Sequence, residues 1–335
     1  MKKYGGVHLT TFTGNTLDNQ KLDNAKSLEK VMLENCTNLN NVMLENCENL
    51  TTITLRDCEN LTTITLNNCK NLTTITVKSC TQLRKLNVSG CTRLQELDLS
   101  LCRGLTELDV SKFTQLQKLK LTMCENLTRL DVSRCTQLQE LDVSYCKGLY
   151  ELDVSGCRES LERLYAAFCN LERLDVSSCA ILQKLNAVNC KNLKELDVST
   201  CTQLKELNVS SCNGLTQLNV SGCRELTKLN ASNCTRLPEA LSFVNCTKLT
   251  ELDVSTCTQL QELDVSHCNR LTKLNVLSCR ELTRLNAMGC NLLKPFDIST
   301  CEKLQRQLNE SYSNVTLPNQ LRIKPQYGTY IIINN

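Results

Sequence analysis

The sequence predicts an all-β repeat solenoid, in which short parallel strands stack coil on coil around a core of leucine, valine and cysteine. Three observations lead to this fold class. Cysteine recurs at nearly every eleventh residue, leucine and valine keep fixed places between the cysteines, and charged residues alternate in sign over two repeats. A repeat this short cannot bury its own apolar face, so it must stack on its neighbours to form a core.

The cysteines define the repeat. All 24 lie on one lattice with a step of eleven residues. The step changes to twelve and then ten around Cys169, and it is twelve again before Cys246. Phe113 fills the slot that lacks its cysteine.

Each unit has the pattern L-x-x-L-x-V-S-x-C-x-x, for example at Leu260, Leu263, Val265 and Cys268. The second leucine and the valine alternate about one polar residue, which is typical of a short half-buried strand. The serine and its neighbour then form a turn before the cysteine points inward. The repeats show no helical period, because no stretch keeps apolar residues at helical spacing for three turns.

Charge sets the size of one coil. The residue before the second leucine is charged in nearly every unit from Lys85 to Arg284, with Glu239 taken as that residue in its unit. Successive units give seven opposite and nine like pairs, whereas every second unit gives thirteen opposite and two like pairs. Adjacent strands lie about 4.8 Å apart, where like charges directly opposite destabilise a sheet. The sequence therefore predicts coils of about 22 residues, with one strand on each broad side and the two sides nearly equivalent.

The chain is expected to fold as one solenoid with a cap at each end. Residues 1–27 are degenerate repeats in which Leu17 and Leu22 keep the pattern and Ala25 occupies the cysteine slot. Residues 28–304 form the solenoid, and residues 305–335 form a C-terminal cap whose LRIK and TYIII segments are predicted strands.

The unit resembles the conserved segment of leucine-rich repeats, L-x-x-L-x-L-x-x-N/C-x-L, as at Leu138, Leu141, Val143 and Cys146. The resemblance extends over roughly residues 28–304. Because the second half of each coil is another copy of the first, the pattern is similar to the short nested bacterial IRREKO repeats and to the cysteine-ladder internalins. The resemblance implies a recognition scaffold that binds protein without catalysis.

The cysteines allow three interpretations. The favoured one is a small buried hydrophobic residue that fits a tight corner, because the apolar Phe113 fills a slot of the same lattice. Disulfides between adjacent coils remain open, since the spacing allows them. A metal array is disfavoured, because the chain has no C-x-x-C motif and only two histidines. Buried reduced thiols favour a reducing compartment.

Composition argues against several function classes. The formal net charge of +3 gives no basic patch that predicts nucleic-acid binding. No apolar run is long enough to span a bilayer, and the lysines near the start precede no apolar stretch of a signal peptide. We find no catalytic set, no glycine-rich phosphate loop and no cofactor or metal motif. The expected location is cytoplasmic, and an effector that works in a host's cytosol fits this expectation.

One broad side carries a row of outward aspartates between the second leucine and the valine. A negative stripe could bind a basic partner, whereas the simpler alternative is that Asp suits the strand edge and that flanking charges screen the row. The candidate residues are Asp109, Asp131, Asp153, Asp175 and Asp197.

A second candidate surface is aromatic. Tyr145 and Phe168 precede cysteines on the same side of adjacent coils, so they are predicted to touch. Tyrosine and arginine are favoured at binding hot spots. The alternative is that the aromatic residues fill an irregular coil where the repeat register slips. The candidate set is Tyr145, Tyr150, Tyr165 and Phe168, with Arg163 and Arg173.

The predicted function is a non-enzymatic protein-binding scaffold whose partner is another protein, with no nucleic acid and no membrane. The alternative is a structural rod that self-assembles through its ends. A monomer favours the scaffold, and end-to-end self-association favours the rod.

Overall fold

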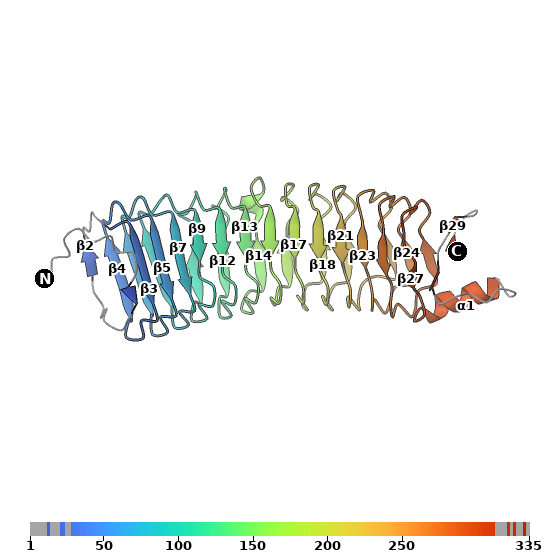
Figure 1. Cartoon of the computed structure of the whole chain (residues 1–335), viewed down its shortest axis with the longest axis horizontal. Helices are drawn as coiled ribbons and strands as arrows, with labels where there is room; N and C mark the ends of the chain where they lie inside the picture. The colour runs from blue at the N-terminus through green and yellow to red at the C-terminus, as the bar shows by residue number, and fades with distance from the viewer. Residues whose placement is uncertain are drawn as a thin grey trace. The chain divides into compact units, whose positions relative to one another are not determined.

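The computed structural model is a parallel β-solenoid with about 22 residues in each coil, which confirms the predicted fold class (Figure 1). It describes residues 28–311 and short strands at 12–13, 21–23, 320–321, 324–325 and 331–332, with side chains described for residues 28–307. The chain divides into two compact units, residues 1–169 and 170–335. The boundary follows Cys169, where the cysteine step changes from twelve to ten residues.

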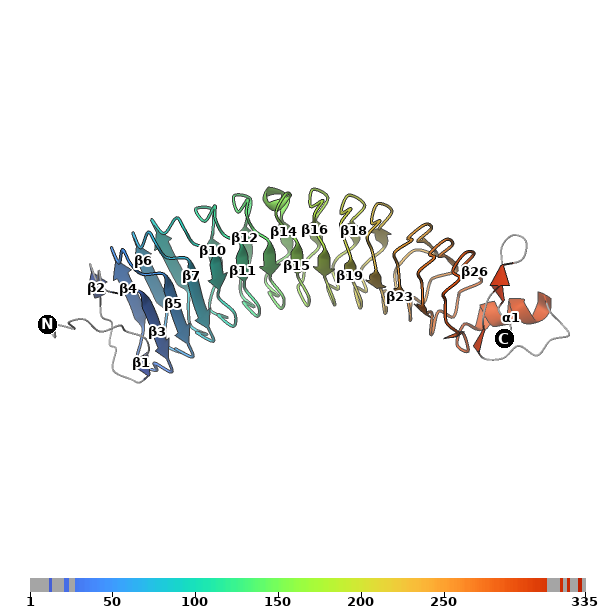
Figure 2. The ribbon, with the colours of Figure 1, turned by 45° about the horizontal axis from the view of Figure 1, so that its top comes forward.

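In the first unit, strands alternate between the two broad sides of the coil (Figure 2). The odd-numbered strands are β1 (Phe12–Thr13), β3 (Lys30–Glu34), β5 (Thr52–Arg56), β7 (Thr74–Lys78), β9 (Glu96–Asp98), β11 (Lys118–Lys120), β13 (Glu140–Asp142) and β15 (Arg163–Tyr165). The even-numbered strands are β2 (Lys21–Asp23), β4 (Asn41–Glu45), β6 (Thr63–Asn67), β8 (Lys85–Ser89), β10 (Glu107–Asp109), β12 (Arg129–Asp131) and β14 (Glu151–Asp153). A short 3-10 helix at Ser155–Cys157 ends at the cysteine from which the twelve-residue step begins.

The second unit continues the alternation. Its odd-numbered strands are β17 (Lys184–Asn186), β19 (Glu206–Asn208), β21 (Lys228–Asn230), β23 (Glu251–Asp253), β25 (Lys273–Asn275) and β27 (Phe296–Asp297). Its even-numbered strands are β16 (Arg173–Asp175), β18 (Glu195–Asp197), β20 (Gln217–Asn219), β22 (Ala240–Ser242), β24 (Glu262–Asp264) and β26 (Arg284–Asn286). The last coil is followed by α1 (Glu302–Ser311), β28 (Gln320–Leu321), β29 (Lys324–Pro325) and β30 (Ile331–Ile332).

The charge argument for a two-repeat coil is confirmed by the strand register. Lys118 in β11 lies opposite Glu96 on one side and Glu140 on the other. The Lys118 Nζ is 2.8 Å from a carboxylate oxygen of Glu96, and the Arg163 guanidinium is 3.2 Å from Glu140. Opposite charges therefore meet along the stack, as the sequence pattern requires.

One residue in that pattern was assigned wrongly. Ala240, and not Glu239, lies opposite Glu262 in the register of β22 and β24. The extra residue of the twelve-residue step precedes β22, so it shifts Glu239 out of the strand. The like-charge pair that the sequence count placed there is therefore absent.

Strand length follows from the residue at the outward position. Strands β3 to β7 span five residues and carry Met or Thr there, whereas strands from β9 onward span three residues or fewer and carry mostly Asp or Asn. The Asp98 Oδ1 accepts a hydrogen bond from the Ser100 backbone N–H at 3.0 Å. Such an Asx turn draws the chain out of the sheet two residues after the aspartate. There are exceptions in both directions, because Asn87 lies in the five-residue β8 and Lys120 lies in the three-residue β11.

Both broad sides contribute equally to the core but not to the sheets. In every described coil the leucine, valine and cysteine positions are almost all buried. The odd-numbered strands of the first unit form one continuous sheet, whereas β10 and β12 are separated from the sheet of β2 to β8. On the odd side, Leu101 has a positive φ and its N–H reaches the Thr122 carbonyl of the next coil at 2.8 Å. Lys112 and Arg134, at the matching even-side turns, lack the positive φ, so the predicted near-equivalence of the sides fails there.

The ends only partly match the prediction. Leu22 lies opposite Leu44, so the degenerate first repeats keep the register of the solenoid. The helix α1 was not predicted, although Glu302 in its first turn and the buried Leu304 favour it. The LRIK and TYIII segments form the short β28 to β30 in part. Leu17, Ala25 and most of the two predicted caps lie outside the described residues.

Candidate functional site

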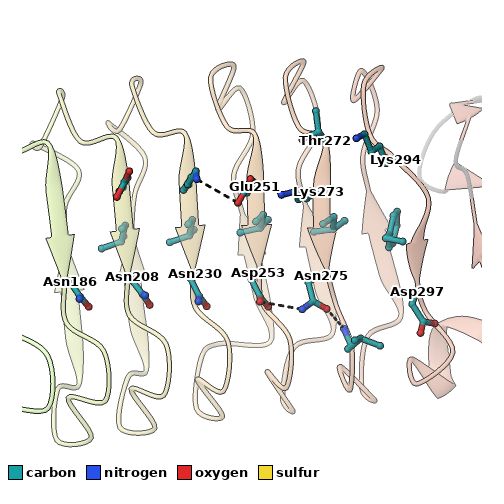
Figure 3. Close-up of a pocket in the computed structure, with 18 of the residues that line it drawn as sticks. Asn186, Asn208, Asn230, Glu251, Asp253, Thr272, Lys273, Asn275, Lys294 and Asp297 are labelled. Carbon is teal, nitrogen blue, oxygen red and sulfur yellow. Dashed lines mark hydrogen bonds and ion pairs between the residues drawn. The ribbon is translucent and has the colours of Figure 1, made fainter.

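A trough of about 790 Å³ crosses the odd-numbered side of the second unit, from β17 to β27 (Figure 3). Each strand contributes its outward side chains, one coil after another. The row at the strand ends consists of Asn186, Asn208, Asn230, Asp253, Asn275 and Asp297. Sequence analysis missed this surface.

The amide groups in the trough are held in a fixed orientation. The Asn208 Oδ1 accepts a hydrogen bond from the Ser210 backbone N–H at 3.0 Å, and Asn230 does the same with Ser232 at 2.9 Å. Because the Oδ1 atom of each side chain faces its own turn as an acceptor, the NH₂ group of the same amide points away from that turn. The Asn275 Nδ2 donates to Asp253 Oδ2 at 3.2 Å, as Figure 3 shows.

A second row in the trough alternates in charge. Glu251 lies between Lys228 and Lys273, with Nζ–Oε distances of 3.9 and 2.9 Å. The hydrogen bond from Lys273 is the largest cause that lowers the pKa of the Glu251 carboxyl. Lys184 and Glu206 form a further pair at 2.7 Å. Charges of both signs are thus spread along the trough. This distribution suits a partner with a mixed polar surface better than a polyanionic partner.

The edge of the trough offers apolar area as well. Leu277 is 37% exposed, and it lies in the lining with Pro295 and Phe296. A signal for this surface was present in the sequence. The outward residue is mostly Asn on this side from Asn186 onward, but sequence analysis followed only the aspartates of the other side.

The predicted aspartate row lies on the even-numbered side, and its first part belongs to the first unit. Asp109 and Asp131 are exposed and lie directly opposite each other in β10 and β12. The Asp131 Oδ1 accepts a hydrogen bond from the Ser133 N–H at 2.9 Å. Hydrogen bonds from Ser133 lower the pKa of Asp131, although the charge of Asp109 opposes them. Asp153 is exposed and makes the same turn.

In the second unit, Asp175 and Asp197 are also exposed. Their Oδ1 atoms accept hydrogen bonds from the N–H groups of Ser177 and Ser199. The hydroxyl groups of these serines, and then their N–H groups, lower the pKa of both carboxyls. These contacts give the aspartates a role in ending each strand. A role in binding a basic partner stays a prediction.

The aromatic contact predicted in the first unit is confirmed. The rings of Tyr145 and Phe168 stack with centroids 4.5 Å apart and an interplanar angle of 6°. Tyr165 lies in β15, opposite Asp142 of β13. Arg163 in the same strand contacts the carboxylates of Glu140 and Glu162 at 3.2 and 3.1 Å.

Two other candidates lie at even-numbered strands. Tyr150, which is 53% exposed, directly precedes β14 in the first unit. Arg173 lies in β16 of the second unit. A role of this set in binding a partner stays a prediction.

The cysteines form rows inside the described coils, where all are buried except the half-buried Cys246. Most of these thiols donate a hydrogen bond to a backbone carbonyl of the preceding coil, as in Cys124 to Leu99 at 3.2 Å and Cys146 to Leu121 at 3.1 Å. Burial raises the pKa of the Cys124 thiol to about 12. Cys124 is therefore a poor nucleophile, and its thiol serves as a hydrogen-bond donor between coils.

Within residues 28–307, no group of three His, Cys, Asp or Glu side chains is arranged to hold a metal ion. None of the described helices is both long and apolar enough to cross a membrane.

Comparison with protein families gives two matches. The model described as the BspA type leucine rich repeat region matches residues 15–139 and 188–294, more than half of the chain. A model described as Zer-1-like leucine-rich repeats matches residues 89–191. No curated protein matches the chain.

Several solved structures are similar to this chain. The functional domain of InlJ from Listeria monocytogenes, which includes a cysteine ladder, is 27% identical over 77% of this chain, with a TM-score of 0.48. The chain covers 62% of that domain. The internalin InlF from Listeria monocytogenes is 19% identical over 82% of this chain and 87% of its own, with a TM-score of 0.45. A TLR13–ssRNA13 complex is 16% identical over 83% of this chain and 56% of its own, with a TM-score of 0.35.

Proposed function

Because the chain belongs to the BspA-type leucine-rich repeat family, we propose that it is a non-enzymatic scaffold that binds another protein on the odd-numbered side of the second unit. The observation that carries this proposal is the trough of about 790 Å³ across β17 to β27. A trough of this size has room for side chains of a protein partner.

The chemistry of the trough supports a protein partner. Oriented amides such as Asn208 and Asn230 supply donors, and Glu251 supplies an acceptor between two lysines. Leu277 adds exposed apolar area at the edge. Protein interfaces combine such polar groups with apolar contact, and hydrogen bonds across them set orientation and specificity.

The test compares two matched double variants. Asn208→Arg/Asn230→Arg fills the trough, whereas Asn219→Arg/Asn286→Arg makes the same change at the same strand position on the even-numbered side. Asn219 and Asn286 also accept a hydrogen bond from the N–H two residues ahead, so both variants lose the same turn contacts.

A partner captured by the wild-type protein would be identified and its affinity measured by calorimetry for each variant. We expect the trough variant to lose at least tenfold in affinity, equivalent to about 1.4 kcal/mol, and the even-side variant to bind like the wild type. If the even-side variant loses binding and the trough variant does not, the proposed surface is wrong.

A further inference from the structure

The residue before each odd-side cysteine of the first unit adopts a positive φ. Four consecutive odd-side coils carry a large side chain at this position. At all other described positions with positive φ, the residue is Asn, Asp, Ser, Thr, His or Gly. Those coils carry Leu101, Met123, Tyr145 and Phe168, with φ of 66°, 62°, 63° and 60°.

These four side chains form one continuous row, which we name the apolar ridge. The N–H of Leu101 bonds to the Thr122 carbonyl at 2.8 Å, directly before Met123. The N–H of Met123 reaches Ser144 in the same way, and the stacked rings of Tyr145 and Phe168 continue the row. Successive members therefore lie one strand spacing apart, about 4.8 Å.

The ridge is unfavourable for the isolated chain. A left-handed backbone conformation costs a residue with a large side chain free energy that glycine, and to a lesser degree asparagine, avoids. The four side chains are also only half-buried. Four apolar residues in strained turns at the surface are a reason to look for a binding role.

Charged residues flank the ridge on both sides. Along the narrow edge of the coils, Glu125 lies between Arg103 and Lys147, at 3.5 and 3.2 Å. Along the odd-numbered sheet, the outward residues of β9, β11 and β13 are Asp98, Lys120 and Asp142. In the first three coils of the ridge the two flanking charges have opposite signs, and the signs alternate from one coil to the next.

We propose that the apolar ridge binds the apolar ridge of a second copy of this chain, with the two copies related by a two-fold axis parallel to the ridge. Both ridges have the same spacing, so they match coil for coil. The rotation places the narrow-edge charges of one copy against the sheet charges of the other. The resulting pairs are Arg103 with Asp98, Glu125 with Lys120, and Lys147 with Asp142 of the second copy.

This complementarity also fixes the register, because a slip of one coil would place like charges opposite each other. The ridge spans four coils, so the interface is small and the association is expected to be weak and dependent on concentration. The surface lies in the first unit and is independent of the proposed partner site in the second unit.

The first test measures self-association by sedimentation velocity over a range of micromolar concentrations. We expect the wild type to shift toward dimer as concentration rises and Leu101→Asn/Met123→Asn to remain monomeric. Asparagine suits the left-handed turn, so the thermal unfolding midpoint of this variant should be retained. Ser211→Asn changes a positive-φ turn of the second unit and should leave association unchanged.

The second test distinguishes the two-fold arrangement from other contacts between copies. Glu125→Lys or Lys120→Glu alone should weaken dimerisation at least tenfold, and the double variant should restore it, because the two residues face each other across the axis. A wild type that stays monomeric at all concentrations would overturn the proposal. So would an asparagine variant that dimerises normally, or a double charge reversal that fails to recover dimerisation.

Discussion

At the scale of single residues, the recurring cysteine combines two properties at one corner of the coil. Its side chain is small and apolar enough to be fully buried, as at Cys124. Its thiol also supplies a hydrogen-bond donor to the Leu99 carbonyl of the preceding coil. Alanine would provide the first property without the second, and serine would bury a more strongly polar group.

Cys124→Ala should therefore destabilise the protein by about 1–2 kcal/mol, because it leaves a small cavity and removes the donor to Leu99. Urea unfolding followed by circular dichroism would measure this change. Lys112→Ala, at an exposed turn position of the same unit, should change the free energy of unfolding by less than about 0.5 kcal/mol. Equal effects of the two substitutions would show that the thiol contributes nothing specific.

At the scale of elements, most of the three-residue strands end where an Asp or Asn side chain accepts a hydrogen bond from a backbone N–H two residues ahead. Asp131 illustrates both the benefit and the cost. It holds the Ser133 N–H at 2.9 Å, yet it lies directly opposite the charge of Asp109. A row of aspartates is thus tolerated because each carboxylate is fixed by its own turn.

Two substitutions at Asp131 should separate these effects. Asp131→Ala removes the acceptor for Ser133 and should cost about 1 kcal/mol. Asp131→Asn keeps the acceptor and removes the repulsion from Asp109, so it should be neutral or stabilising, most clearly at low salt. Thermal melts at two ionic strengths would measure both. If Asn destabilises as much as Ala, the charge itself stabilises the row.

The strand pattern was largely predictable from the sequence, whereas the surfaces proposed for binding were not. Register followed from charges such as Lys118 and Glu140, because opposite charges must meet one coil apart. The trough was missed, since the outward Asn residues resemble ordinary strand ends when read singly. The contact between Tyr145 and Phe168 was predictable, because both residues precede cysteines on the same side of adjacent coils.

At the scale of the whole molecule, many of the buried thiols in the two units share one electrostatic property. Burial raises their pKa from the ordinary value near 9 to about 11 or 12. Examples are Cys124, Cys135, Cys201, Cys234, Cys279 and Cys301.

The free energy of unfolding should consequently fall steeply as the pH rises from about 9 to about 12 in the presence of a reductant. In the unfolded chain these thiols lose their protons near pH 9, whereas the folded chain keeps them bound, so rising pH favours unfolding. Each pKa unit corresponds to about 1.4 kcal/mol per thiol, and several such thiols exceed the 5–15 kcal/mol, roughly, that stabilises a typical domain.

Far-ultraviolet circular dichroism and thiolate absorbance, recorded together during an alkaline titration, would test this prediction. The thiolate signal should rise only as the secondary structure is lost. Thiolates that form near pH 9 in a chain with intact strands would contradict it, because their pKa would then be close to that of exposed cysteine.

The hydrogen bonds of the thiols also have a direction along the chain. Within each unit, a cysteine such as Cys146 or Cys212 donates to a carbonyl about 25 residues earlier in the sequence. The acceptor is therefore always synthesised before the donor. At roughly 5–20 residues per second of translation, a new coil of about 22 residues emerges every few seconds. Each new coil can pack on the coil that was synthesised before it, so the solenoid can grow during synthesis one coil at a time.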